Sequence, residues 1–436
     1  MFYLFQLEKH NSSFKKELTA GFTTFFTMAY IMVVNPLILL DAGVPFQQSF
    51  TATVIAAMLG TLIMGLYANY PIAIAPAMGL NAYFAYSVVK TNQGLDYHIA
   101  FSAVFVAGIL FVILSLTPLR SKLIEAIPNN LKHAITAGIG LFIAFLGLRM
   151  SGLITAHPSN LVALGDLHSP SVILALIGLL ITLIFYSLNI NGALFFGMIL
   201  TGLIAFLTGQ LQFTNGFVSM PTLPEGILVS NPVTAFREVI EYGLYSVVFS
   251  FLLVTLFDTT GTVLGVAEQA GLMKGNKLPR AERALLSDSV ATLFGSMLGT
   301  SPTSAYVESA SGVAAGGRTG LTAVFIALLL GIGAFFGPLI SAVSGLSAIT
   351  APSLIIVGSL MVGSVRHINW ELPDEAFPAF LVLLSMPLTS SIATGISLGF
   401  ISYPLMKILR GKWRQVHPLV YLFGVLFAIQ LIAVPH

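Results

Sequence analysis

Two stretches of sequence decide the fold, and they read PIAIAPAMGLNAYFAYSV (71–88) and TSPTSAYVESASGVAAGG (300–317). Each is interrupted by proline and glycine, and Asn-Ala-Tyr at 81–83 is echoed by Ser-Ala-Tyr at 304–306. Interrupted apolar segments at matching places in two halves of a chain indicate a binding site between inverted repeats. We therefore expect a short extended piece and a half-helix in each stretch, with helix N–H groups facing the centre. Ordinary proline kinks are the alternative interpretation.

The rest of the chain is strongly apolar. Of its 436 residues, 56% are hydrophobic and only 8% are charged, whereas soluble domains carry about 25% charged residues. The mean hydropathy is +0.92 and the formal net charge is +2. This composition excludes a soluble enzyme, a nucleic-acid-binding protein and a disordered scaffold. The absence of cysteine from the sequence excludes disulfides, thiolate zinc sites and thiol catalysis.

Apolar runs long enough to cross a bilayer, about 20 residues, recur along the whole sequence. We expect an all-α integral membrane protein with fourteen spanning segments, seven in each half, so that the two halves have opposite orientations. A further apolar stretch, 419–433, is expected along the inner face, with a fifteenth span left open. The fourteen segments are expected at about 18–39, 51–68, 71–89, 99–116, 134–148, 172–188, 192–207, 242–266, 284–299, 300–315, 321–343, 347–365, 377–388 and 391–409.

The distribution of Lys and Arg supports this count. Basic residues favour cytoplasmic loops, and a cytoplasmic N-terminus places most of the 19 Lys and Arg residues on the inner side. Only Lys90, Arg149 and Arg237 are then left outside. An even number of segments with both ends in the cytoplasm follows.

Three acidic residues interrupt the apolar runs, namely Asp258, Asp288 and Glu308. A carboxylate in the middle of a membrane helix costs about 2.5–3.5 kcal/mol even on insertion scales. Because no Lys or Arg occupies the middle of a segment, these acids must be protonated, hydrogen-bonded or directed into a polar cavity. A structural carboxyl held by a neighbouring helix is the alternative, and it is strongest for Asp288, about one turn from an inner loop.

Other polar and aromatic residues accompany these acids. Thr303 and Ser304 precede the acid of the tenth segment, and Asn81 is the single amide within the third. An amide both donates and accepts hydrogen bonds, and Phe84 and Phe257 offer faces for stacking. No phosphate-binding loop, metal cluster or catalytic constellation is visible, so neither an enzyme nor a cofactor is expected.

Four motifs make the sequence recognisable: GFTTFFTMAYIMVVNP (21–36), APAMGLNAYFAY (75–86), LFDTTGTVLGVAEQAG (256–271) and TSAYVESASGVAAGGRTGLTAV (303–324). They closely resemble the AzgA-like purine permeases, a branch of the nucleobase/ascorbate transporter superfamily. The resemblance implies a uracil-permease-type fold of seven-plus-seven inverted repeats. It also implies proton-coupled uptake of hypoxanthine, guanine or adenine across the plasma membrane.

The resemblance further implies a division into two domains. A core domain is expected from residues 1–133 and 242–345, which hold segments one to four and eight to eleven. A gate domain is expected from residues 134–241 and 346–436, which hold segments five to seven and twelve to fourteen with the C-terminal stretch. The partners implied are a purine nucleobase, protons and the lipid bilayer, and a homodimer is left open.

The resemblance also assigns roles to individual residues. Asp258 and Glu308 match the acidic substrate-site positions, Asn81 matches the polar position of the third segment, and Asp288 matches a family acid. The same three acids are the expected proton-coupling residues, and Thr303, Ser304, Phe257 and Phe84 complete the expected substrate site.

The chemistry of a purine agrees with this assignment. Its flat neutral ring carries N–H donors and carbonyl or nitrogen acceptors, which carboxyl and amide groups recognise. Hypoxanthine and guanine are the favoured substrates, with an adenine-preferring permease of the same family as the alternative. An anion transporter of the same fold is less expected because two acids repel an anion, and a channel is disfavoured because rings of charged residues are absent from the sequence.

Overall fold

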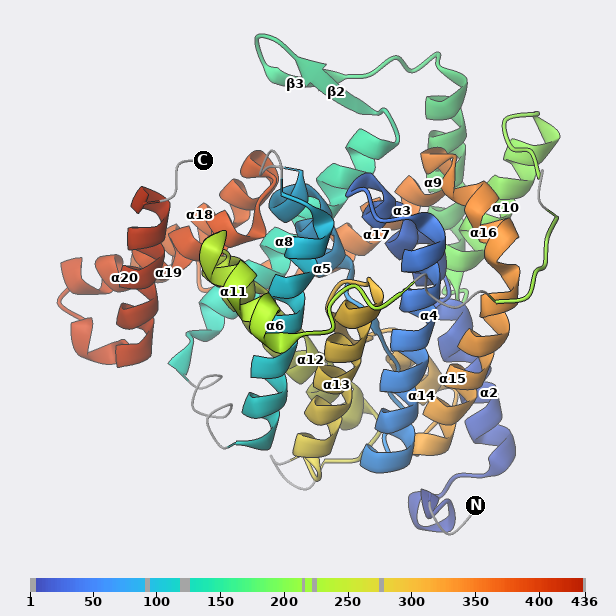
Figure 1. The fold of residues 1–436 in the computed structure, drawn as a ribbon, viewed down its shortest axis with the longest axis horizontal. Helices are drawn as coiled ribbons and strands as arrows, with labels where there is room; N and C mark the ends of the chain where they lie inside the picture. Colours follow the sequence, from blue (N-terminus) through green and yellow to red (C-terminus); the bar gives the residue numbers. More distant parts are fainter. Residues whose placement is uncertain are drawn as a thin grey trace.

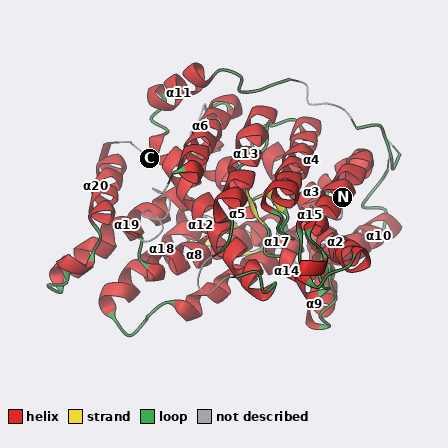
Figure 2. Ribbon diagram, turned by 90° about the horizontal axis from the view of Figure 1, so that it is seen from below, coloured by secondary structure: helices red, strands yellow, loops and turns green. Residues whose placement is uncertain are grey.

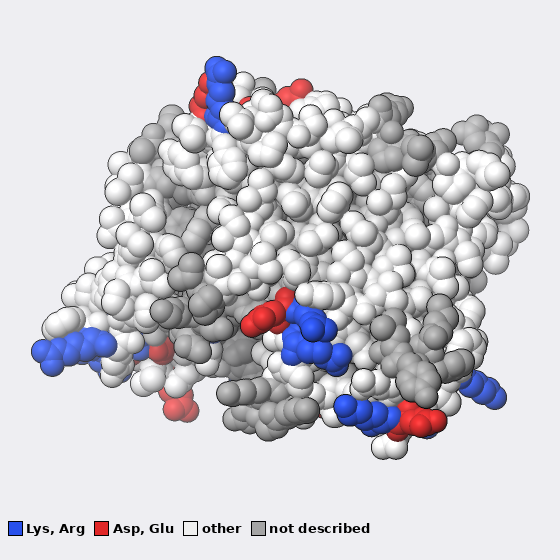
Figure 3. Space-filling model, turned by 60° about the horizontal axis from the view of Figure 1, so that its bottom comes forward, with Lys and Arg blue, Asp and Glu red and all other residues white. Residues whose placement is uncertain are grey.

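The computed structural model describes residues 5–90, 95–117, 126–213, 216–221, 226–273 and 278–433. Within these ranges, nine helices are long and apolar enough to cross a membrane. Figure 3 shows a broad surface without Lys, Arg, Asp or Glu between a small charged group at one edge and a row of charged side chains near the other. Four residues expected in inner loops, namely Arg120, Lys122, Lys274 and Lys277, lie outside the described residues.

All fourteen predicted segments are found as helices or interrupted helices (Figure 1). The predicted all-α membrane fold is therefore confirmed. The first half contains η1 (Glu8–His10), α2 (Phe14–Met28), α3 (Ile31–Asp41), α4 (Phe46–Ile63), η2 (Met64–Ala68), β1 (Ile74–Pro76), α5 (Met78–Ala82), η3 (Tyr83–Val89), α6 (Tyr97–Leu116), α8 (Asn129–Met150), β2 (Ile154–His157), β3 (Leu161–Leu164), α9 (Pro170–Ser187) and α10 (Ala193–Leu207).

The second half begins with an amphipathic surface helix that the sequence did not predict, as it did not predict the β2–β3 hairpin. The elements are α11 (Pro232–Glu241), α12 (Tyr245–Gln269), α13 (Ala281–Leu298), β4 (Thr303–Ala305), α14 (Ser309–Ala314), α15 (Gly320–Gly333), η4 (Ala334–Phe336), α16 (Gly337–Ser344), α17 (Ser347–Val362), η5 (Gly363–His367), α18 (Pro373–Thr389), α19 (Ile392–Leu409), η6 (Trp413–Gln415) and α20 (Pro418–Ala433).

The two interrupted segments meet at the centre of the bundle. β1 and β4 pair antiparallel, with Ala75 opposite Ser304, and Figure 2 shows helices surrounding the short strands. The backbone N–H of Ala77 donates to the Pro302 carbonyl at 2.9 Å. Extended backbone inside a membrane protein must have its polar groups satisfied by protein, and this pairing satisfies them. Each strand is followed by a short helix, α5 or α14, as the sequence predicted.

Helix contacts fall into two groups. The first group joins α2, α3, α4, α6, α12, α13 and α15, and it also contacts β1 and β4; the second joins α8, α9, α10, α17, α18 and α19. Figure 1 shows α18 and α19 at one side of the molecule and α9 and α10 at the other, with α8 and α17 between them. The expected division of the chain into core and gate domains stays a prediction; residue 133, its first expected boundary, lies within α8.

Two glycines allow α8 and α17 to pack closely. A Cβ atom added to Gly140 would lie 2.7 Å from the Gly358 carbonyl oxygen, and one added to Gly358 would lie 2.5 Å from the Gly140 oxygen. Farther along, Gly147 approaches the Ala351 carbonyl in the same way. Because the residue numbers rise on one helix while they fall on the other, α8 and α17 run antiparallel.

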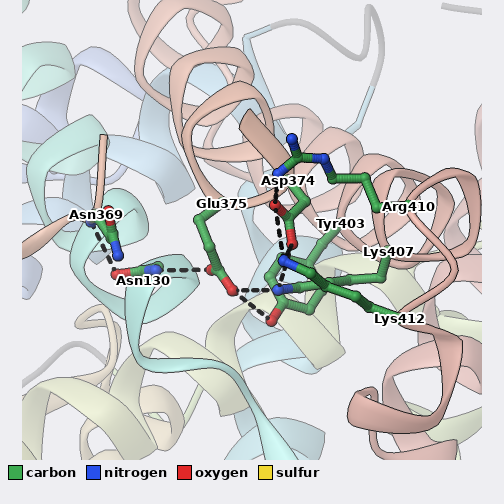
Figure 4. A network of polar contacts seen from close by, with 8 residues as sticks. All are labelled: Asn130, Asn369, Asp374, Glu375, Tyr403, Lys407, Arg410 and Lys412. Atoms are coloured by element: carbon green, nitrogen blue, oxygen red, sulfur yellow. Dashed lines mark hydrogen bonds and ion pairs between the residues drawn. The ribbon is translucent and has the colours of Figure 1, made fainter. Parts of the chain in front are cut away.

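A buried ionic cluster joins α18 to the end of α19 (Figure 4). The side chain of Asp374 is 0% exposed and that of Lys407 is 5% exposed. Burying charges is costly unless they are paired, and the Asp374 carboxylate is paired three times. Its cationic partners, at 2.9, 2.8 and 3.1 Å, are Lys407, Arg410 and Lys412.

The neighbouring Glu375 extends this cluster to α8. Its Oε1 accepts from Lys407 at 2.5 Å and from the Tyr403 hydroxyl at 3.1 Å. Its Oε2 accepts from the Asn130 amide at 2.7 Å, and Asn130 Oδ1 accepts from the backbone N–H of Asn369. The cluster therefore fixes α8, α18 and α19 to one another at one end (Figure 4).

The C-terminal stretch forms α20, which packs against α19 and α12. The Phe423 ring lies 4.5 Å from Phe249 and 5.9 Å from Phe400, measured between ring centroids. Gly424 allows close approach, because an added Cβ would lie 2.7 Å from the Phe400 carbonyl oxygen. The stretch is therefore anchored to apolar helices rather than lying apart from them.

Candidate functional site

A cavity of about 450 Å³ lies where the two interrupted segments face α8 and α17. The strand ends and half-helix starts form one side, and α12 and the α2–α3 joint contribute to it. The residues from α8 and α17 are mostly apolar. The lining consists of Tyr30, Ala77, Met78, Gly79, Thr136, Asp258, Thr262, Ser304, Ala305, Tyr306, Val307, Glu308, Val357, Leu360 and Met361.

Three of the residues singled out in the sequence meet at this cavity, namely Asp258, Ser304 and Glu308. Asp258 lies in the middle of α12, and its carboxyl is hydrogen-bonded to the Ser304 side chain. Glu308 immediately precedes α14, and its Oε1 accepts a hydrogen bond from the Tyr30 hydroxyl at 2.7 Å. No Lys or Arg is among the described residues of the lining, so the two acids face one space without a cationic partner there.

Asp288 and Thr303 lie behind the cavity rather than in its lining. The Asp288 side chain is fully buried in α13 and accepts hydrogen bonds from the hydroxyls of Thr259 and Thr303. Thr303 belongs to β4, and Thr259 follows Asp258 on α12. The Thr259 hydroxyl also accepts a hydrogen bond from the backbone N–H of Ala305. Asp288 therefore joins α12, α13 and β4 outside the lining of the cavity.

Asn81 also lies outside the lining. Its side chain is 0% exposed, and its amide donates to Asn35 Oδ1 at 3.0 Å. The Asn35 amide in turn donates to Thr53 and Thr300, at 2.6 and 2.9 Å. This network ties α5 to α3, α4 and the segment before β4. Direct contact of Asn81 with a ligand stays a prediction.

The two phenylalanines have different surroundings. Phe257 borders a small hollow of about 30 Å³ that adjoins the cavity and also includes Asp258. The Lys132 ammonium lies 5.9 Å from the centre of the Phe257 ring. Phe84 is 0% exposed and stacks on Phe101 at 4.5 Å between ring centroids. Stacking of a ligand on Phe84 likewise stays a prediction.

Sequence reasoning missed several residues of the lining. Tyr30, Thr136 and Met361 face the cavity from the α2–α3 joint, α8 and α17. Tyr30 lies within a motif that carries the family resemblance, but with 13 Tyr and 33 Phe in the chain no single aromatic residue stands out. Thr136 and Met361 are ordinary membrane-helix residues, so only the packing of the helices identifies them.

The cavity lies toward one end of the antiparallel pair formed by α8 and α17. Thr136 is in the first half of α8, and Met361 is near the end of α17. At the other end the two groups of helices touch, because the Ser87 hydroxyl after α5 donates to the Ser390 carbonyl between α18 and α19. The Tyr86 hydroxyl there contacts the Met150 sulfur at 3.7 Å.

Comparison with known proteins identifies the family of the chain. The profile described as the permease family, Xan_ur_permease, matches residues 15–398. The guanine/hypoxanthine permease PbuO of Bacillus subtilis (strain 168) is 66% identical over 429 residues, covering 98% of this chain and 99% of that protein. The adenine permease AdeP of Escherichia coli (strain K12) is 43% identical over 430 residues, covering 98% and 95%.

The solved transmembrane domain of the cyanobacterial bicarbonate transporter BicA shares the fold. Its TM-score is 0.64 at 17% sequence identity, and the match covers 87% of this chain and 97% of that one. Because the sequence identity is low, this match shows a common fold and nothing about the substrate. The match over most of the chain and the high identity to two nucleobase permeases show that this chain belongs to the Xan_ur_permease family of nucleobase permeases, as its resemblance to the AzgA-like branch predicted.

Proposed function

We propose that this protein is a proton-coupled symporter that carries purine nucleobases into the cell, with hypoxanthine and guanine preferred. The observation that carries the proposal is that Asp258 and Glu308 line one cavity between the interrupted segments, where no described cation neutralises them. The 66% identity to a guanine/hypoxanthine permease supports the choice of substrates.

The cavity suits a small flat heterocycle. Its volume of about 450 Å³ falls within the range of about 300–1,000 Å³ that is typical of small-molecule sites. A carboxylate accepts N–H bonds from the purine edge, and a protonated carboxyl donates one to a carbonyl or ring nitrogen. Apolar residues of α17 opposite the acids, such as Val357 and Leu360, offer a surface for the ring faces.

The same acids supply the proton coupling. An acid buried without a cation gains stability when it takes up a proton, so binding of a proton and of a neutral base at one cavity favour each other. Asp258 and Glu308 are the proposed proton carriers at the cavity. Asp288 accepts hydrogen bonds from Thr259, the neighbour of Asp258 on α12, and from Thr303 of β4, and it is proposed to help position Asp258.

We further propose that the two groups of helices are the core and gate domains, which move against each other during transport. With the N-terminus in the cytoplasm of a plasma-membrane protein, the cavity faces the inner side. The contact between Ser87 and Ser390 then closes the outer side.

Two alternatives differ in substrate. Adenine is favoured by the 43% identity to an adenine permease. Transport of an inorganic anion is the second alternative, because this chain shares its fold with the bicarbonate transporter domain. Two acids at the cavity disfavour a negatively charged substrate.

Uptake of radiolabelled hypoxanthine tests the proposal directly. The full chain is expressed in cells that lack their own purine uptake, and unlabelled hypoxanthine, guanine, adenine, uracil, sulfate and bicarbonate are added as competitors. Hypoxanthine and guanine are expected to compete most strongly. Absence of saturable purine uptake by protein that is present in the membrane, or transport of sulfate or bicarbonate instead, contradicts the proposal.

A further inference from the structure

Tyr30 makes the side-chain contact that links the α2–α3 joint to an acid of the cavity. The residue lies between the end of α2 at Met28 and the start of α3 at Ile31, and only 1% of it is exposed. Its hydroxyl donates to Glu308 Oε1 at 2.7 Å, and both residues line the cavity. A hydroxyl that donates to a carboxylate forms a charge-assisted bond, which is short and strong.

The end of α2 also contacts the backbone of Glu308. Thr27 lies in the last turn of α2, three residues before Tyr30. The Thr27 hydroxyl lies 3.1 Å from the Ser311 hydroxyl and 3.5 Å from the Glu308 carbonyl. Ser311 donates to the same carbonyl at 2.6 Å. Thr27 and Ser311 therefore fix the main chain, while Tyr30 fixes the carboxyl.

The charged and titratable groups near Glu308 come from four elements. Tyr30 comes from the α2–α3 joint, Tyr306 from the interrupted segment itself, and Asp258 from α12. From α8, Lys132 borders the adjoining hollow. The Tyr306 hydroxyl donates to the Pro76 carbonyl at 2.6 Å. Among the hydrogen bonds between described side chains, the bond from Tyr30 is therefore the one directed at the Glu308 carboxyl.

We propose that Tyr30 is a positioning residue that holds Glu308 Oε1, directs Oε2 toward the purine, and sets how readily this carboxyl takes up a proton. The inference rests on the proposed function of Glu308. Hydrogen bonding to the ionised form of an acid favours that form. The tyrosine keeps its own proton throughout, so it tunes the acid without exchanging charge.

Tyr30→Phe removes the hydroxyl and keeps the ring. Hypoxanthine uptake is measured as a function of external pH, together with the amount of protein in the membrane. Because the ionised acid loses a charge-assisted bond, the alkaline limb of the pH profile is expected to move upward by about one to two pH units. The Km for hypoxanthine is expected to rise as the carboxyl loses its fixed orientation.

Tyr70→Phe is the matched control. Tyr70 is also fully buried, and its hydroxyl donates to the Pro279 carbonyl away from the cavity. This variant is expected to retain the wild-type pH profile. A second test replaces Tyr30 with 3-fluorotyrosine, which is nearly isosteric and a stronger donor, so the profile is expected to move to lower pH even where the phenylalanine variant does not accumulate.

The outcomes separate this inference from the proposed function. If Glu308→Gln transports hypoxanthine normally, the role of Glu308 itself is wrong. If Glu308→Gln is inactive while both Tyr30 variants keep the wild-type pH profile and Km, only the positioning role is overturned. Lower uptake of Tyr30→Phe with an unmoved profile also overturns it, because a merely structural role predicts that result.

Discussion

Ala75 and Ser304 face each other at the centre of the antiparallel pair formed by β1 and β4. This register makes positions of the two interrupted segments equivalent. Four residues after Ala75 is Gly79, and four residues after Ser304 is Glu308. Both line the cavity. The halves of the site are therefore unequal: one presents an acid, and the other presents bare backbone against α8.

Gly79→Ala is expected to impair transport because there is no space for the added methyl group. A Cβ at this position would lie 2.4 Å from Ile139 Cγ2 on α8, and overpacking of this kind costs about 1–3 kcal/mol. The added methyl group lies between the two groups of helices, so the Vmax of hypoxanthine uptake is expected to fall severalfold while the amount of protein in the membrane is unchanged.

Two further variants test this steric explanation. Adding Ile139→Ala to Gly79→Ala removes the clashing methyl and is expected to restore part of the uptake. Gly202→Ala in α10 is the matched control, because its added Cβ meets an ordinary contact at 3.9 Å. Full activity of Gly79→Ala alone would show that the contact with α8 does not matter for transport.

Asp258→Asn and Glu308→Gln are each expected to abolish or severely reduce purine uptake while the protein still reaches the membrane. Each substitution keeps the shape of the side chain but removes the titratable proton and the second acceptor oxygen. Asp166→Asn makes the same chemical change on an exposed loop, where the side chain is 73% exposed, and is expected to be silent. Near-normal uptake by either cavity variant contradicts its assignment.

The driving ion is expected to be the proton. In proteoliposomes, hypoxanthine accumulation should follow an imposed pH gradient, collapse on addition of a protonophore, and persist when potassium replaces sodium. The physical reason is that the acids at the cavity, Asp258 and Glu308, lack a described cation that would hold them ionised. Sodium-dependent accumulation that ignores the pH gradient overturns this expectation.

Much of the fold follows from the sequence because membrane physics leaves few choices. Spanning helices are predictable from apolar length, and the cost of a buried charge makes Asp258 and Glu308 conspicuous among the apolar residues around them. The structure places both at the cavity. The positions of the interruptions are likewise predictable, since proline and glycine disrupt regular helices.

The register and the surrounding contacts could not be predicted in this way. The echo between 81–83 and 304–306 suggests that Asn81 corresponds to Ser304, but the backbone pairs Ala75 with Ser304. Strands of three residues carry too little side-chain pattern to fix a register. The contact between Tyr30 and Glu308 joins residues 278 positions apart, and nothing in the local sequence of either residue indicates the other.

Asn81→Ser is expected to act first on stability. The substitution removes the amide that donates to Asn35 Oδ1, and losing a buried hydrogen bond costs about 1–3 kcal/mol. The purified variant should therefore melt at a lower temperature, with the ranking of hypoxanthine, guanine and adenine unchanged. An altered ranking at unchanged melting temperature would instead indicate direct contact with the purine, as the sequence predicted.

Asp374→Asn is expected to destabilise the second group of helices more than any exposed charge change. Lys407 is 5% exposed and contacts this carboxylate at 2.9 Å, so the variant leaves a buried ammonium with one acidic partner, Glu375. Removing one member of a buried ion pair costs on the order of 3–5 kcal/mol, whereas exposed pairs contribute little.

Thermal unfolding of the purified protein measures the difference. The control is Arg237→Ala, which breaks the exposed pair to Glu241. Replacing both Asp374 and Lys407 by Leu and Met should recover part of the loss, because the buried ammonium of Lys407 is removed together with the carboxylate that it pairs with. Equal melting temperatures for Asp374→Asn and Arg237→Ala would show that the cluster does not brace α18 against α19.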